Sequence, residues 1–62
     1  MLEFTDVFTG KRFTLPITRL VRVNEVENEE RCEVVYEELN HICTVVVDDS
    51  YEMVKVKLDE LR

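Results

Sequence analysis

One histidine and two cysteines are the side chains best suited to metal binding or nucleophilic chemistry. His41 lies two residues before Cys43 and nine after Cys32. A structural zinc site needs four ligands in close pairs, and this chain lacks that pattern. A nucleophilic cysteine needs a base, and it is activated by a cation or a helix N-terminus. Both cysteines instead alternate with apolar strand residues, so we expect reduced, buried thiols, no metal, no cofactor and no enzyme activity.

Four basic side chains in the first third of the chain form a second candidate site. They are Lys11, Arg12, Arg19 and Arg22. Guanidinium groups match the geometry of phosphate oxygens, so these residues are candidate ligands for phosphate or a nucleotide bound between subunits. The alternative is that they pair with nearby glutamates and keep a sheet edge soluble.

Acidic residues dominate the rest of the chain. Four cations against two carboxylates give residues 1–22 a net charge of +2, whereas four against twelve give residues 23–62 a net charge of −8. This excess repels phosphate backbones, which argues against nucleic-acid binding. Seven glutamates crowd positions 25–38: Glu25, Glu27, Glu29, Glu30, Glu33, Glu37 and Glu38. They form either a solvated face or a docking surface for a basic region of a larger protein.

The length of 62 residues predicts a single domain over 1–62. No apolar run is long enough to cross a membrane, and residues 1–6 have neither the basic nor the hydrophobic region of a signal peptide. We therefore expect a cytoplasmic protein.

A first hairpin is predicted near the N-terminus. A short strand starts at Leu2, and residues 11–15 alternate apolar and polar side chains after Gly10, the only glycine, which marks the turn. Pro16 ends the second strand because it cannot donate to a sheet. Residues 17–19 then connect to a β-branched strand at 20–26, in which Val21 and Val23 alternate with polar residues.

A second hairpin joins strands within 31–38 and 42–47. A two-residue loop at Leu39-Asn40 sets Glu38 opposite His41 and, from there, the register of the whole pair. One face is then apolar: Cys32, Val34, Tyr36, Cys43, Val45 and Val47. The reverse face mixes Glu33, Glu37 and Thr44 with Val35, Ile42 and Val46.

The last segment fits a helix. Asp49 lies three residues before Glu52, the capping-box spacing, and one helical stripe collects Tyr51, Val54, Leu58 and Leu61. Residues 54–58 also alternate as a strand does, which leaves an all-β fold with a sixth strand as the alternative. We therefore predict an α+β fold, a small antiparallel sheet or partly open barrel of about five strands with a C-terminal helix.

Five apolar side chains point away from this one-sided core. They are Val35, Ile42, Val46, Met53 and Val56. A chain this short has a marginal core, and covering such groups with a second subunit adds stability. We therefore expect a homo-oligomer that uses these five residues as its interface.

The order of motifs resembles a known family. Leu2-Glu3-Phe4-Thr5, the run from Phe8 through Gly10 to Leu15, the strand from Leu20 to Val23, and the valine-rich end from Val45 to Val54 are similar to the small FlbD-type proteins associated with bacterial flagella and swarming. Short acidic β-rich proteins also occur among bacteriophage accessory genes. The resemblance implies this fold and no catalytic residues.

The expected function is a non-enzymatic protein–protein interaction module, homo-oligomeric, that modulates a larger bacterial or phage-encountered assembly. The alternative is a binder of a small anionic ligand, formed between subunits around the four basic residues.

Overall fold

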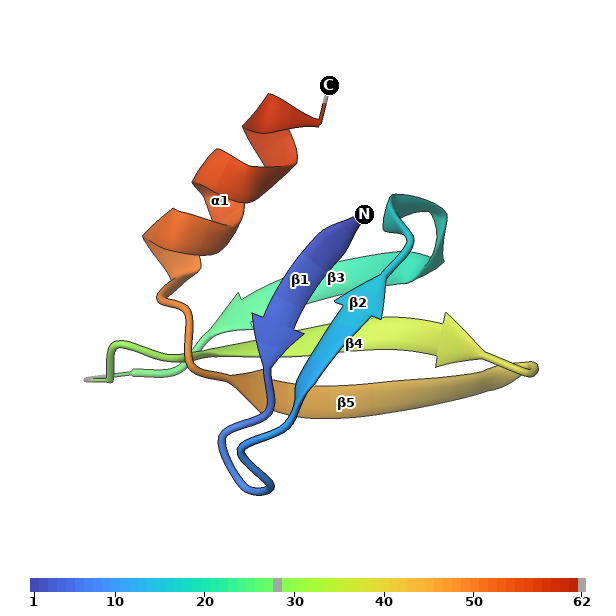
Figure 1. The fold of residues 1–62 in the computed structure, drawn as a ribbon, viewed down its shortest axis with the longest axis horizontal. Coiled ribbons are helices and arrows are strands. Elements are labelled where there is room, and N and C mark those ends of the chain that lie inside the picture. The colour runs from blue at the N-terminus through green and yellow to red at the C-terminus, as the bar shows by residue number, and fades with distance from the viewer. Residues whose placement is uncertain (28, 62) are drawn as a thin grey trace.

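Five strands and one α-helix make up the part of the chain that the computed structural model describes, residues 1–27 and 29–61 (Figure 1). In chain order the elements are β1 (Leu2–Thr5), β2 (Arg12–Leu15), the 3-10 helix η1 (Ile17–Arg19), β3 (Leu20–Glu25), β4 (Cys32–Glu38), β5 (His41–Val47) and α1 (Tyr51–Glu60). β1 and β2 form one antiparallel sheet, and β3, β4 and β5 form a second in that order. The predicted α+β fold is confirmed, with a helix rather than a sixth strand at its end.

Asp6 organises the turn between β1 and β2. Its carboxylate accepts the backbone N–H of Phe8 at 2.8 Å, and its own N–H donates to the carbonyl of Lys11 at 2.9 Å. Gly10 has φ +72°, the left-handed region in which glycine is unstrained. The predicted hairpin turn at Gly10 is therefore confirmed.

A bulge interrupts the pairing of β3 with β4. Leu20 pairs with Tyr36, but the next matched pair is Arg22 with Val35, so Val21 is the extra residue. Val21 is 52% exposed, whereas Leu20 packs against the core. The simple alternation predicted for this strand is wrong at Val21, because the added residue changes which side chains face inward.

The β4–β5 hairpin has the predicted register throughout. Glu38 pairs with His41 and Cys32 with Val47. The two loop residues, Leu39 and Asn40, have φ of +49° and +67°, as a two-residue turn of the I′ kind requires.

Hydrogen bonds link the two sheets through the end of β1. Asp6 pairs with Val47, the N–H of Val7 donates to the carbonyl of Val46 at 3.0 Å, and the N–H of Asp48 donates to Thr5 at 3.1 Å. The strands thus follow the spatial order β2-β1-β5-β4-β3. Figure 1 shows β1 and β2 crossing over the other three strands, and β2 and β3 lie at the two ends of this order.

The core lies on the apolar face of β4 and β5, beneath β1, β2 and α1. Its buried members are Leu2, Phe4, Leu15, Cys32, Val34, Val47 and Val54. The rings of Phe4 and Phe13 lie 5.8 Å apart at a tilt of 44°, a favourable aromatic arrangement. We call the opposite face of the β3–β5 sheet the outer face.

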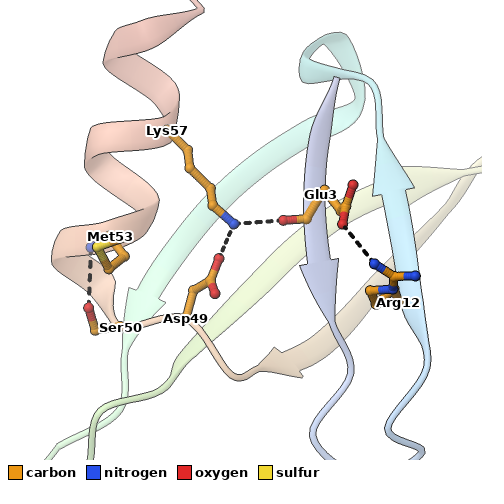
Figure 2. Close-up of polar contacts among 6 residues, drawn as sticks. All are labelled: Glu3, Arg12, Asp49, Ser50, Met53 and Lys57. Atoms are coloured by element: carbon orange, nitrogen blue, oxygen red, sulfur yellow. Dashed lines mark hydrogen bonds and ion pairs between the residues drawn. The ribbon is translucent and has the colours of Figure 1, made fainter.

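Ser50, and not Asp49, caps the terminal helix. The Ser50 hydroxyl accepts the N–H of Met53 at 3.2 Å, as Figure 2 shows. The predicted cap at Asp49 is wrong because its carboxylate binds Lys57 instead. Three residues of the predicted helical stripe face the core: Val54 is buried, and Tyr51 and Leu58 pack against it. The fourth, Leu61, follows the last helical residue and is 44% exposed.

Candidate interaction sites

Arg12 and Lys11 lie at the turn end of β2 and are exposed. The Arg12 guanidinium approaches the Glu3 carboxylate across the hairpin at 3.8 Å (Figure 2). Both side chains are mostly exposed, and such pairs contribute little to stability. The cation therefore stays accessible to a ligand or partner.

Arg19 lies beyond the other end of β2, at the end of η1. It lines a cavity of about 210 Å³ at the gap between the two sheets, with Phe13, Thr14, Leu15, Pro16, Tyr36 and Glu38. Burial, the nearby Cys43 thiol and the Glu38 carboxylate raise the pKa of the Tyr36 phenol, which keeps it a neutral hydrogen-bonding group.

Arg22 occupies a third position, on the outer face opposite Val35. The four predicted anion ligands thus divide into Lys11 and Arg12 at one end of β2, Arg19 past its other end, and Arg22 on the outer face. Four strand residues at about 3.3 Å each separate the ends of β2 by roughly 10 Å. Within the described ranges, the fold offers these four cations no common pocket.

The predicted interface residues differ in exposure. Val35 lies on the central strand between Arg22 and Thr44, and these cross-strand neighbours help to bury it within the monomer. Ile42, in contrast, is 62% exposed, and Val46 on the same face is partly buried. Val35 therefore has little exposed surface for a partner to contact, whereas more than half of the Ile42 side chain is available.

Met53 and Val56 are about half exposed and lie one helical turn apart on α1. The opposite side of α1 places Val54 in the core. The helix surface with Met53 and Val56 is therefore separated from the outer face by the core itself.

The outer face is polar around Ile42. Its residues, assigned from the strand register, are Arg22, Asn24, Glu33, Val35, Glu37, Ile42, Thr44 and Val46. The amide of Asn24 donates to the Glu33 carboxylate at 3.1 Å. Glu37, the cross-strand neighbour of Ile42, and Arg22 are exposed, so the face presents charges of both signs beside an apolar side chain.

The two cysteines are free and share the core face. Cys32 is fully buried, and this burial, assisted by Asp49 and opposed by Lys57, raises the pKa of its thiol to about 11. Cys43 is only partly buried, so the prediction of two buried thiols is right for Cys32 and wrong for Cys43. Cys43 lies near the turn of the β4–β5 hairpin, whereas Cys32 lies at the far end of the pair beside the buried Val47.

Sequence reasoning missed the contact centre at Lys57. Its ammonium donates to the Asp49 carboxylate and, at 2.8 Å, to the backbone carbonyl of Glu3 (Figure 2). It also lies 5.2 Å from the centre of the Phe4 ring. No local pattern signals this contact, because Asp49 precedes the first helical residue and lies eight residues from Lys57, beyond the i,i+4 spacing at which helical side chains meet. These contacts tie α1 to β1.

Across residues 1–27 and 29–61, no three His, Cys, Asp or Glu side chains gather in a metal-binding group. No helix in the same ranges has the length and apolarity needed to cross a membrane.

Comparison of the chain with known protein families, with curated proteins and with solved structures finds no match in any of the three.

Proposed function

We propose that this protein is a non-enzymatic interaction domain that self-associates through its outer face and, as an oligomer, docks on and modulates a larger assembly. The exposure of Ile42 carries the proposal. This side chain is 62% exposed within a sheet face and not in a turn. Full burial of an isoleucine contributes roughly 1.5–3 kcal/mol, which is large for a small domain.

The charges on the outer face support a second copy as the occupant. Arg22 on β3 and Glu37 on β4 are exposed and of opposite sign. In a two-fold dimer, Arg22 of each copy can meet Glu37 of the other, so one contact forms twice. The same face thus supplies both the apolar centre and its own charge partners.

The chemistry of the cysteines supports a non-enzymatic role. A raised thiol pKa removes Cys32 from the reactive thiolate form. The free thiols are in keeping with a cytoplasmic location. The resemblance to FlbD-type proteins suggests a bacterial or phage-encountered assembly as the larger partner, and the acidic segment around Glu29 and Glu30 suggests a basic surface on it.

A charge-swap experiment tests the dimer. Sedimentation equilibrium should show a dimer for the wild type, and Arg22→Glu or Glu37→Arg alone should weaken it about tenfold, since each leaves like charges facing one another. The double variant should restore the wild-type dissociation constant. A monomeric wild type, or two single variants that dimerise normally, would overturn this assignment.

The anion-binding alternative stays a prediction. The structure separates its four cations into three places, so it adds no observation in favour of that function.

A further inference from the structure

In the part of the chain that the structure describes, β2 pairs with β1 alone, and backbone groups at its other edge point outward. The carbonyls of Glu3 and Thr5 on β1 bond to Lys57 and Asp48, so both point away from β2. In an antiparallel pair the residues opposite them must likewise point away from β1. Those residues are Thr14 and Arg12, the cross-strand partners of Glu3 and Thr5. Two N–H groups and two carbonyls are thus presented at the edge of β2.

Hollows flank this edge on both faces of the β1–β2 sheet. On the inner face lies the cavity of about 210 Å³ that Phe13, Leu15 and Tyr36 line. On the other side lies a wider hollow of about 330 Å³ lined by Glu3, Arg12, Phe13 and Thr14. Successive side chains of a strand point to opposite faces. A strand added beside β2 would therefore send its side chains alternately into the two hollows.

We propose that the edge of β2 binds an extended peptide segment of another protein by strand addition. Main-chain hydrogen bonds to Arg12 and Thr14 supply affinity, and the two hollows select alternating side chains. The inner cavity, with two aromatic rings and Leu15, accepts apolar side chains. In the outer hollow the exposed Arg12 guanidinium lies 3.8 Å from Glu3, and a carboxylate of the added segment would take the place of Glu3 as its partner.

Three cations near β2, against the two carboxylates that line the hollows, Glu3 and Glu38, favour an acidic segment. Lys11, Arg12 and Arg19 lie along β2 and just past it, in the third of the chain whose net charge is +2. The partner segment is therefore an alternating apolar and acidic sequence. This site is separate from the outer face on which the proposed dimer rests.

A second copy of the chain fits this edge poorly. β2 is four residues long and Pro16, which has no N–H to donate, follows it, so a β2–β2 ladder is short. Such a ladder buries far less than the roughly 1,200 Å² of a stable protein interface. It would also bring the cations Lys11 and Arg12 of both copies close together, and these like charges repel.

The test uses the full chain and the probe peptide acetyl-Asp-Val-Thr-Phe-Glu-amide. Titration followed by amide NMR should give saturable shifts at residues 12–19 and 36–38. Amide hydrogen exchange at Arg12 and Thr14, fast in the free protein, should slow on binding. A peptide with proline in place of its central threonine, which lacks that N–H donor, should not bind.

Matched charge variants separate the β2 edge from general electrostatics. Arg12→Glu should weaken peptide binding about tenfold, whereas Lys55→Glu on the exposed side of α1 should change it less than about twofold. Absence of shifts at millimolar peptide, or shifts centred on β3, would overturn the proposal. Slow exchange at Arg12 and Thr14 without peptide would show that a second copy covers the edge and would also overturn it. The dimer test reads stoichiometry instead, so the two proposals fail independently.

Discussion

Lys57 is the residue that joins the last element of the chain to the first strand. Its ammonium bonds to Asp49 and to the carbonyl of Glu3, and it is mostly covered. Lys57→Met should lower the free energy of unfolding by about 1.5–3 kcal/mol, because it leaves a half-buried carboxylate and a strand carbonyl without their donor. Urea denaturation measures this change.

Lys55→Met is the matched control for that measurement. Lys55 lies in the same helix and pairs with Glu52 at 3.7 Å, but both side chains are exposed. Its replacement should cost less than about 0.5 kcal/mol. Equal losses for the two variants would contradict a special role for Lys57.

Cys32 makes stability depend on pH in the alkaline range. The folded-state pKa of its thiol is about 11, above the ordinary value of 9.0, so the unfolded chain loses this proton first. Stability from this group is complete below pH 9 and is lost as the pH rises from 9 toward 11. Cys32→Ala should flatten that part of the curve of unfolding free energy against pH.

Cys43→Ala serves as the reference, because it removes a thiol and keeps Cys32. Its curve should fall between pH 9 and 11 as the wild type's does. Parallel curves for Cys32→Ala and the wild type would show that Cys32 contributes nothing to the slope.

At the scale of elements, the loop between β4 and β5 has backbone strain at Leu39, whose exposed side chain contributes no burial to offset it. Leu39 has φ +49° and is 85% exposed. Leu39→Asn should raise the free energy of unfolding by about 0.5–1 kcal/mol, since asparagine tolerates the left-handed region better. Asn40→Val should lower it by about 1 kcal/mol or more, because φ at Asn40 is +67°. Thermal and urea unfolding of the two variants check the opposite signs.

The sequence predicts well those elements whose geometry depends on a few neighbouring residues. A two-residue loop fixes the register of a hairpin, so all of the β4–β5 pairing follows from placing Leu39 and Asn40. The bulge at Val21 has no such rule, because it depends on how β3 must bend against β4. The cap at Ser50 was missed because Asp49 fits the same sequence pattern. The Asp49 carboxylate bonds to Lys57 instead, and this contact leaves Ser50 as the cap.

At the scale of the whole molecule, the predicted anion site is divided because its four residues lie on different elements and faces. The four cations fall within twelve positions, yet Arg12 begins β2, Arg19 lies beyond its other end, and Arg22 is on the outer face. Strand geometry separates residues that a helix would bring together. Conversely, β1 and α1 lie at the two ends of the chain and meet at Lys57, which no local pattern states.

The architecture also predicts that only one of the two surfaces that hold the predicted interface residues forms the proposed dimer. Ile42 lies on the outer face, whereas Val56 lies on the far side of α1, and the core between them prevents a single flat contact from covering both. Ile42→Glu should therefore shift the protein to monomer, with a dissociation constant weakened at least about tenfold, because it buries a charge at the centre of the contact. Val56→Glu introduces the same group at a similarly exposed position and should leave sedimentation unchanged. At concentrations where the wild type is also monomeric, both variants should stay folded, since neither side chain is in the core. The new carboxylate of Ile42→Glu faces Glu37 across the strands and should lower the melting temperature slightly. Dissociation by Val56→Glu with no effect of Ile42→Glu would move the interface to the helix and leave the outer face without a partner.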